Sequence, residues 1–276
     1  MFDPKTNKFP YPEYTDQHYL KVKKNNGLVF DENYDFIDNR KSFKFKRFWV
    51  RILLATIVFP MTKIRMGLKI NGKQNLKRFK HVIDNGVISA ANHVHLWDYL
   101  MITYAIRFRH PHVLVWAPNI RGETGGLMRL VGGIPIPDDS HKGTIKLLST
   151  IEEMMERGKW LHIYPEGSMW EYYQPIRPFK RGAAYFAIHT NRPIIPMAFS
   201  YREPSWIRKH IFKQDAAITV TVGEPIYKDD TLPEAEQRID LATRVHEAIC
   251  KLANLEDGEN LYPPIFNHNK RAENDN

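Results

Sequence analysis

The chain has 276 residues, a mass of 32.4 kDa and a formal net charge of +9, from 40 Lys and Arg against 31 Asp and Glu residues. With 43% hydrophobic and 26% charged residues, the composition is globular, which excludes a chain that is disordered throughout. The single cysteine, Cys250, excludes a disulfide framework and a metal site built on cysteines. The positive charge favours an anionic partner: a membrane lipid, a nucleic acid or an acidic carrier protein.

No uncharged apolar run reaches the roughly 18–20 residues that cross a bilayer. The longest approach to one, Ile52–Thr62, is much shorter than that. The first residues, MFDPKTNKFP, lack the apolar stretch of a signal peptide. We therefore expect a peripheral or monotopic protein on the cytoplasmic face of a membrane.

The first predicted unit is a basic, aromatic-rich N-terminal extension over residues 1–66. Within it, Arg47–Pro60 is predicted to form an apolar helix with basic residues at its start and a proline at its end. Such a helix suits a membrane interface, where each basic side chain near anionic headgroups contributes on the order of 1 kcal/mol. The alternative is an ordinary helix buried in a soluble core.

Apolar strands alternate with helices in the second predicted unit, residues 67–258. This alternation predicts an α/β domain with a mostly parallel central sheet flanked by helices. A polar C-terminal tail is expected over residues 259–276. Strands are predicted over residues 87–91, 112–117, 160–164, 193–200 and 217–222, and helices over 97–109, 123–131, 143–157, 182–190 and 233–255.

Two of these helices carry clear apolar faces. In the terminal helix, Cys250 is interpreted as a packing residue of the core and not as a reactive thiol. The helix over residues 143–157 shows the clearest amphipathic pattern. We expect its buried side to hold Ile145, Leu148, Ile151, Met154 and Met155.

Two polar loops directly follow predicted strands. Residues 92–98 come after the strand that ends at Ala91, and residues 164–168 come after the strand that ends near Tyr164. In an open α/β sheet, functional sites lie in the crevice beyond the carboxyl ends of the strands. Both loops are therefore predicted to meet at the same edge of the sheet.

The first loop offers a histidine and a carboxylate five positions apart. This spacing allows Asp98 to accept a hydrogen bond from one imidazole nitrogen of His93, leaving the other nitrogen free to take a proton. Such a base activates a hydroxyl or an amine as a nucleophile. In the alternative interpretation, Asp98 caps the following helix and His93 is an ordinary loop histidine.

The second loop places Glu166 at the same edge, where a buried carboxylate is costly unless it binds another group. Ser168 is a poor candidate for a hydrolase nucleophile because no Gly-x-Ser-x-Gly elbow surrounds it. The absence of a P-loop and of Gly-x-Gly-x-x-Gly leaves nucleotide binding without a motif. His93 and His95 form a His-x-His pair, but no third ligand at an informative spacing supports a metal site.

These loops resemble two motifs of the glycerolipid acyltransferases, the family of the lysophosphatidic acid (1-acylglycerol-3-phosphate) acyltransferases. Asn92, His93 and Asp98 are similar to the family's motif I, and the Tyr-Pro-Glu-Gly-Ser of residues 164–168 is similar to motif III. The order and spacing of the motifs extend the similarity over about residues 85–225. Gly-Gly-Ile-Pro-Ile at 132–136 lies where motif II belongs, Phe-Lys-Arg-Gly-Ala at 179–183 continues it, and Pro-Ile-Ile-Pro at 193–196 resembles motif IV.

The resemblance implies transfer of an acyl group from acyl-CoA or acyl-carrier protein to a lipid hydroxyl. It implies that His93 is the general base, that Asp98 orients it, and that Glu166, Gly167 and Ser168 help to bind the acceptor. It also implies no covalent acyl-enzyme, no metal and no cofactor beyond the donor substrate. The chemistry agrees, because a thioester is already activated and needs only a base and a place for the oxyanion.

Two positions depart from the family pattern. Asp138 and Met169 stand where the family commonly has the arginines assigned to the acceptor's phosphate. Each lost charge-assisted hydrogen bond removes on the order of 1.5–3 kcal/mol. Arg121, Arg177, Lys180 and Arg181 are candidates to replace them, although a solvated helix start also explains Lys180 and Arg181.

We therefore expect an acyltransferase acting on a lysophospholipid or a related glycerolipid, with an anionic membrane lipid and acyl-CoA or acyl-carrier protein as partners. One alternative is an acceptor lipid or alcohol without a phosphate. Another is a membrane-associated, binding-only homologue. A nucleic-acid partner is not expected, because charge and aromatic residues are unaccompanied by a recognition motif.

Overall fold

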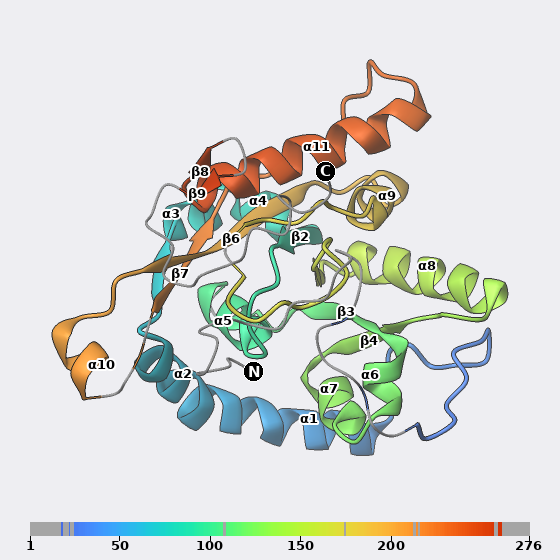
Figure 1. Ribbon diagram of the computed structural model, residues 1–276. Helices are drawn as coiled ribbons and strands as arrows, with labels where there is room; N and C mark the ends of the chain where they lie inside the picture. Colours follow the sequence, from blue (N-terminus) through green and yellow to red (C-terminus); the bar gives the residue numbers. More distant parts are fainter. Residues whose placement is uncertain are drawn as a thin grey trace, which may run out of the picture.

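The computed structural model describes residues 25–106, 109–173, 175–211, 214, 216–256 and 259–260, together with His18 and Val22. A seven-stranded sheet runs through the middle of the molecule (Figure 1). Its strand order is β1-β7-β6-β2-β5-β3-β4. The strands are β1 (Lys69–Asn71), β2 (Val87–Ala91), β3 (His112–Trp116), β4 (Gly133–Ile136), β5 (Trp160–Ile163), β6 (Ile194–Arg202) and β7 (Ala217–Val222).

The sheet is mostly parallel, as predicted. The five strands β6, β2, β5, β3 and β4 pair in parallel with one another. Strand β7 pairs antiparallel with β6, and the short edge strand β1 pairs parallel with β7, so these two strands run opposite to the other five. Consequently the carboxyl ends of β2 and β5 lie side by side, and the loops that follow them are neighbours.

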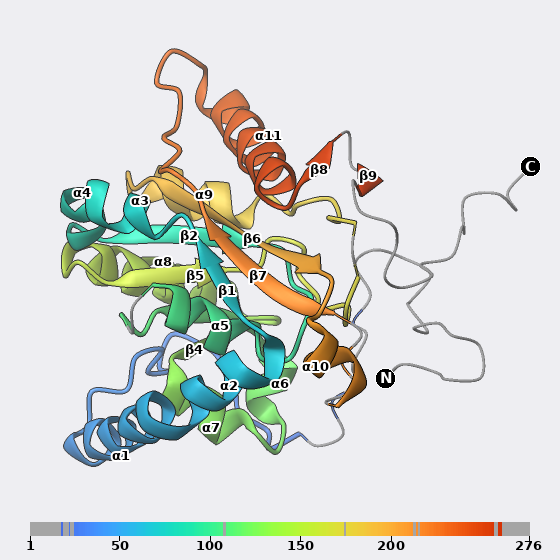
Figure 2. The same ribbon diagram turned by 90° about the vertical axis from the view of Figure 1, so that its left-hand side faces the viewer.

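Side chains of the central strands point alternately into two cores, one on each face of the sheet. In β2, Ile88 and Ala90 enter the first core, and Val87 and Ala91 enter the second. Both faces are therefore covered, which is why these strands are almost continuously apolar. The covering helices include α3 (Lys73–Arg78), α4 (Lys80–Asp84), α5 (Asp98–Ala105), α6 (Ala117–Arg121), α7 (Gly125–Val131), α8 (His141–Glu156), α9 (Gly182–His189) and α11 (Glu234–Leu252) (Figure 2).

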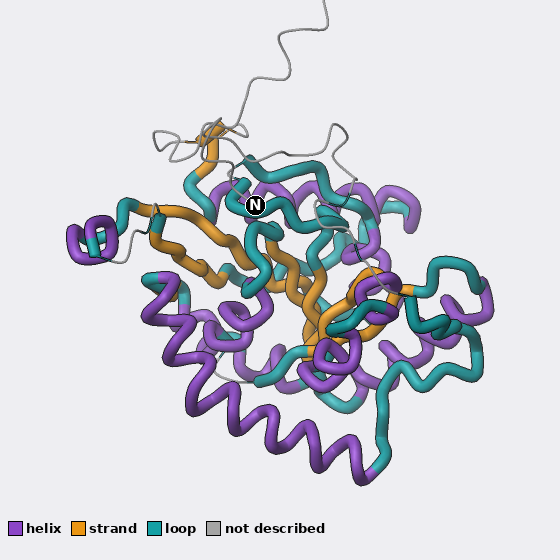
Figure 3. The backbone as a smooth tube through the Cα atoms, turned by 60° about the horizontal axis from the view of Figure 1, so that its bottom comes forward, coloured by secondary structure: helices purple, strands orange, loops and turns teal. Residues whose placement is uncertain are grey.

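The N-terminal helical segment is longer than the sequence suggested. Helix α1 (Lys41–Leu53) passes through a π-helical turn (Leu54–Val58) directly into α2 (Phe59–Met66). Pro60 therefore does not end the helix. It occupies the first turn of α2, where a missing N–H is tolerated, and the π turn just before it re-routes the backbone hydrogen bonds. Figure 3 shows this helical run along one side of the molecule.

The described helices include none that is both long enough and apolar enough to cross a membrane. Helix α1 lies on the surface and buries none of its residues completely, so it is not an ordinary core helix. The predicted tail begins at the second strand of a small antiparallel pair, β8 (Leu255–Glu256) and β9 (Glu259–Asn260). The rest of that tail, and most of the first 24 residues of the extension, lie outside the described residues.

Candidate active site

The predicted pair of His93 and Asp98 is present. His93 lies in the loop after β2, and Asp98 is the first residue of α5. The Nδ1 atom of His93 lies 2.9 Å from Oδ2 of Asp98, and the same oxygen accepts the backbone N–H groups of Val94 at 2.7 Å and His95 at 3.0 Å. Asp98 therefore bonds to the loop before it and does not cap the helix that it starts.

The loop after β5 holds the His93 backbone from both sides. The Oε2 atom of Glu166 accepts the His93 N–H at 3.2 Å, and the Trp170 N–H donates to the His93 carbonyl at 3.2 Å. The Tyr172 N–H adds a bond to the Val94 carbonyl at 2.7 Å. The two predicted motif loops thus form one hydrogen-bonded unit.

Glu166 is balanced by a buried cation, Arg177. Both side chains are only 2% exposed, and Nη2 of Arg177 lies 2.6 Å from Oε2 of Glu166. Arg177 also donates through Nη1 to Oγ of Ser168 at 2.6 Å and through Nη2 to the Ser168 carbonyl. Burial raises the pKa of Glu166, but Arg177 and the backbone N–H groups bonded to it oppose that rise. Ser168 is therefore held as an acceptor for arginine.

One face of the His93 imidazole is covered by Tyr164. The rings stack with their centroids 3.9 Å apart and their planes 13° apart. The His93 side chain keeps 24% of its surface exposed, whereas Asp98 is fully buried. With Nδ1 bound to Asp98, the Nε2 atom finds no hydrogen-bond partner among the described residues. The arrangement leaves Nε2 available to a ligand.

Burial opposes charge on both members of this pair. It lowers the pKa of His93, with a further contribution from the positive charge of Arg177, and it raises the pKa of Asp98. The imidazole is therefore neutral near pH 7, which is the form that accepts a proton. The hydrogen bond to Asp98 places the imidazole hydrogen on Nδ1 and the free electron pair on Nε2.

Gly167 forms the tight turn of the second loop with a φ of 77°, a conformation that favours glycine. The side chain of Lys180 lies directly over it: a Cβ atom at Gly167 would be 2.9 Å from Cε and 3.0 Å from Nζ of Lys180. The Lys180 N–H donates to the Pro165 carbonyl at 2.8 Å. The structure thus brings Lys180 over the Gly167 turn, while Arg181 is exposed at the start of α9.

Arg121 is already matched by an acid. It forms two hydrogen bonds to Asp138, of 2.5 Å and 2.9 Å, and its Nε donates to the Leu28 carbonyl at 2.8 Å. Asp138 stands at one of the positions where the family commonly has arginine, and Met169, at the other, is buried. A role for Arg121 in acceptor binding stays a prediction.

The described residues contain no group of three His, Cys, Asp or Glu side chains that could hold a metal ion. His95, the second member of the His-x-His pair, is buried and accepts the Trp97 N–H on Nδ1 at 3.0 Å. Through that hydrogen bond, the His95 ring stabilises its own loop.

Comparison with known proteins agrees with this geometry. The family model described as Acyltransferase matches residues 67–200. The chain is also similar to 1-acyl-sn-glycerol-3-phosphate acyltransferases from Cocos nucifera, at 24% identity over 199 residues, and from Limnanthes douglasii, at 23% identity over 202 residues. The family model spans just under half of this chain, and these similarities agree with the resemblance of its motifs to the glycerolipid acyltransferases.

Each of these matches covers 66% of this chain, and they cover 63% of the Cocos nucifera protein and 69% of the Limnanthes douglasii protein. Among solved structures, the chain resembles the 1-acyl-sn-glycerophosphate (LPA) acyltransferase PlsC from Thermotoga maritima, with a TM-score of 0.50 and 16% identity. That match covers 78% of this chain and 84% of the Thermotoga protein, and it concerns the fold.

In the candidate site, Asn92 and Tyr164 had no separate role assigned from the sequence, and Arg177 was a candidate for the acceptor's phosphate, whereas the structure pairs it with Glu166. Asn92 replaces a backbone partner at the end of β2, because its side-chain amide exchanges two hydrogen bonds with the Phe199 backbone, of 2.8 Å and 3.1 Å. Tyr164 covers the His93 ring, and Arg177 neutralises Glu166. A buried glutamate needs a cationic partner, but the sequence holds 40 lysines and arginines and does not say which one supplies it.

Proposed function

We propose that this chain transfers a fatty acyl group from a thioester donor, acyl-CoA or acyl-carrier protein, to a hydroxyl of a lysophospholipid or related glycerolipid. The observation that carries the proposal is the state of the His93 imidazole. It is neutral, fixed through Nδ1 by Asp98, clamped by the loop of Glu166 and accessible at Nε2.

The proposed reaction uses His93 as both base and acid. The acceptor hydroxyl gives its proton to Nε2 while its oxygen bonds to the thioester carbonyl carbon, forming a tetrahedral intermediate. Collapse of the intermediate breaks the carbon–sulfur bond. The sulfur then leaves as a thiol after taking the proton from the imidazolium, so His93 returns to its neutral form. Buried Asp98 stabilises that imidazolium and keeps its orientation.

The acceptor's anionic group is assigned to Lys180, with Arg181 as an additional cation. Arg121 is bonded to Asp138 and Arg177 is bonded to Glu166 and Ser168, so the geometry favours Lys180 over both. A single flexible ammonium supports a less selective acceptor site than two arginines would. An acceptor lipid or alcohol without a terminal phosphate is therefore the second candidate.

We also propose that α1, α2 and α10 (Trp206–His210) dock the enzyme on an anionic membrane at the cytoplasmic face. Helix α10 adjoins α2, since Nη1 of Arg208 donates to the Ile64 carbonyl. Large apolar side chains stay exposed along these helices, and lysines and arginines lie between them. The exposed apolar side chains are Phe45, Phe48, Trp49, Ile52, Leu53, Ile57, Met61, Ile64, Trp206, Ile207 and Ile211.

The direct test incubates the purified wild type and His93→Ala with oleoyl-CoA and a panel of lysolipids and neutral glycerolipids. Thiol release and lipid products are followed together by absorbance and mass spectrometry. A new acylated lipid that the variant does not form supports the proposal and names the acceptor. Phosphatidic acid as the sole product rules out the phosphate-free acceptor. No thiol release by the wild type, with an acyl-carrier-protein donor also supplied, contradicts the proposed activity.

A further inference from the structure

A cavity of about 880 Å³ lies at the other end of the sheet from His93. His112, at the start of β3, and Lys159, just before β5, line it, whereas His93 and Glu166 follow the ends of β2 and β5. At roughly 3.3 Å per residue, the four residues of β5 separate the two ends by about 13 Å. A group bound in this cavity is therefore too far away to react at Nε2 of His93.

The cavity is strongly basic. Some of its cations are already matched: Arg109 pairs with Asp84 outside the lining, and Arg157 pairs with Glu153. The side chains of Lys44, Arg51 and Lys159 have neither an ion pair nor a hydrogen bond within the part of the chain that the structure describes. The lining contains seven cations, Lys44, Arg47, Arg51, Arg109, Lys146, Arg157 and Lys159, against two acids, Asp35 and Glu153.

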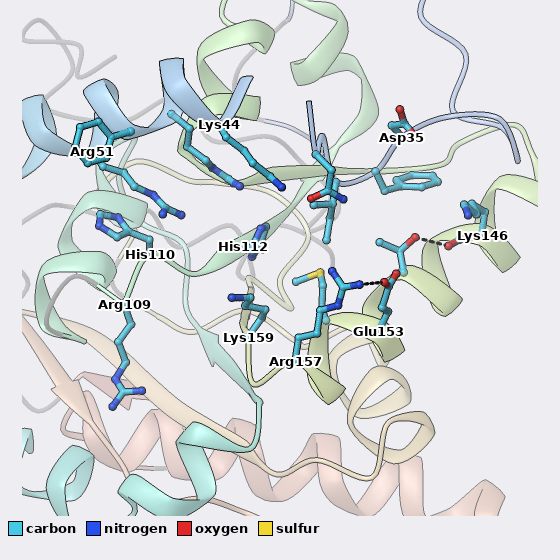
Figure 4. A pocket seen from close by; sticks show the side chains of 17 residues that line it. Asp35, Lys44, Arg51, Arg109, His110, His112, Lys146, Glu153, Arg157 and Lys159 are labelled. Atoms are coloured by element: carbon cyan, nitrogen blue, oxygen red, sulfur yellow. Dashed lines mark hydrogen bonds and ion pairs between the residues drawn. The ribbon is translucent and has the colours of Figure 1, made fainter. Parts of the chain in front are cut away.

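His112 provides the second, independent observation. Its side chain lines the cavity and the residue is only 8% exposed, yet neither ring nitrogen has a hydrogen-bond partner among the described residues. Figure 4 shows the ring between Arg51 and Lys44 of α1 on one side and Lys159 on the other. A buried imidazole without a partner is unusual in a native protein, and an acceptor bound in this cavity would supply one.

The electrostatics at this end of the sheet also favour an anion. Burial together with the charges of Arg47, Arg51, Lys159 and Arg129 lowers the pKa of His112 to about 3. Burial and the charges of Arg51 and Arg129 also lower the pKa of Arg47, and Tyr99 and Asp38 offset only part of this effect. A neutral imidazole has one N–H group, which can donate a hydrogen bond to an anion without adding another positive charge to the cavity.

We propose that this cavity binds a phosphate-bearing anion through Arg51, Lys159 and His112, separately from the acyl-transfer site. The guanidinium of Arg51 and the ammonium of Lys159 are suited to bind phosphate oxygens, and His112 adds a neutral N–H donor. Helix α1 directs Lys44, Arg47 and Arg51 to the cavity. Since its exposed side carries Phe45 and Trp49, the phosphate can belong to a lipid headgroup, and a soluble phosphate compound shares the same chemistry.

The test compares the full-length wild type with two double variants. Arg51→Gln/Lys159→Gln removes two cavity cations, and Lys73→Gln/Lys77→Gln removes the same charge from α3, which is not part of the cavity lining. Calorimetric titration with inorganic phosphate measures the soluble source. Co-sedimentation with vesicles of phosphatidylcholine, alone or mixed with phosphatidic acid, measures the lipid source. Circular dichroism melting establishes that each variant is folded.

The cavity variant is expected to bind its phosphate source at least about tenfold more weakly than the wild type, while the α3 variant is unchanged. A loss confined to vesicles with phosphatidic acid assigns a lipid headgroup, and a loss confined to inorganic phosphate assigns a soluble compound. Equal losses in both double variants would show that only net charge matters and would overturn the proposal, as would a wild type that binds neither source.

A measurement on the wild type alone guards against misfolding of the variants. The ring nitrogens of histidine-labelled protein are followed by NMR during the phosphate or vesicle titration, with His112→Asn used to assign the signal. The His112 signal is expected to shift as the site fills. Binding that leaves this signal unmoved contradicts the proposal.

Discussion

The Oδ2 atom of Asp98 lies 2.9 Å from Nδ1 of His93, and this oxygen also accepts the N–H groups of Val94 and His95. Three N–H groups donate to this one oxygen. They bind the ionised carboxylate more tightly than the protonated acid, because the ionised form is purely a hydrogen-bond acceptor. Asp98 thus fixes both the loop that carries His93 and the tautomer of the His93 imidazole.

Asp98→Asn is expected to lower kcat by roughly 10²–10⁴-fold, because the neutral amide neither stabilises an imidazolium at His93 nor enforces the tautomer with its hydrogen on Nδ1. His93→Ala is expected to lower it at least as far. The measurement is thiol release from acyl-CoA in the presence of the acceptor. A loss in which the pH profile of the Asn variant matches that of the wild type would contradict a role for Asp98 in orienting the base.

Arg177→Met is expected to destabilise the protein by about 3–5 kcal/mol, because it leaves the Glu166 carboxylate buried without a cation. Urea unfolding followed by circular dichroism gives the free energy of unfolding. The matched control is Glu166→Gln/Arg177→Met, which removes both charges and should recover much of the loss. A double variant that is no more stable than Arg177→Met would show that the ion pair is not the cause.

Lys180→Gln is expected to raise the KM for a phosphate-bearing acceptor by about tenfold, with the KM for the thioester donor unchanged. The reason is the position of its side chain over Gly167, beside the two motif loops. Arg181→Gln removes the adjacent exposed cation, which lacks this contact, and is expected to have a clearly smaller effect on the same KM. Equal effects of the two changes would indicate that general charge, and not the position of Lys180, attracts the acceptor.

His162 makes the stability of the protein depend on pH. Its Nδ1 lies 2.8 Å from Ser89 Oγ, which in turn accepts the Trp160 indole N–H at 2.7 Å. Burial lowers the pKa of His162 from 6.5 to about 3. Between these two values the unfolded chain takes up a proton that the folded chain does not, so the free energy of unfolding falls as the pH falls below 6.5.

At pH 5 this one histidine is expected to cost about 2 kcal/mol of stability relative to neutral pH. Buried Asp98 and Glu166 act in the opposite direction over part of this range, since burial raises the pKa of each carboxyl group. The measurement is therefore a difference: urea unfolding of the wild type and of His162→Gln at several pH values between 7 and 5. The variant should show the shallower fall on acidification, and parallel curves would contradict the assignment.

The sequence was sufficient to predict the helices and strands with clear periodicity, and the contact between His93 and Asp98 after one of the strands. The predicted strand over residues 217–222 matches β7, and the His93 loop and the Glu166 loop meet because β2 and β5 are parallel neighbours. Strands β1 and β4 were not predicted, because β1 has only three residues and β4 contains a glycine and a proline, which are uncommon in strands.

Two details were not predicted correctly. In α8 the buried face includes Leu147, whereas the predicted Ile145 is 54% exposed, so that part of the prediction was wrong. Leu147 shares a face with Ile151 and Met154, four and seven residues later, whereas Ile145 lies on the opposite side of the helix. The choice of Arg177 as the partner of Glu166 follows from the path of the loop after β5, which no local pattern shows.

The exposed apolar face of α1 leads to the last prediction, on membrane binding. Trp49→Glu is expected to weaken binding to vesicles that contain phosphatidic acid by at least about tenfold, because burying a large apolar side chain contributes roughly 1.5–3 kcal/mol and a new negative charge repels the anionic surface. Ile239→Glu is the matched control: Ile239 is 46% exposed on α11, which lies on the opposite side of the molecule from α1 (Figure 1). Co-sedimentation measures both. Equal losses of binding in both variants would show that only net charge matters. If only Trp49→Glu loses binding but still transfers acyl groups to a detergent-dispersed acceptor, membrane docking is separate from the chemical step.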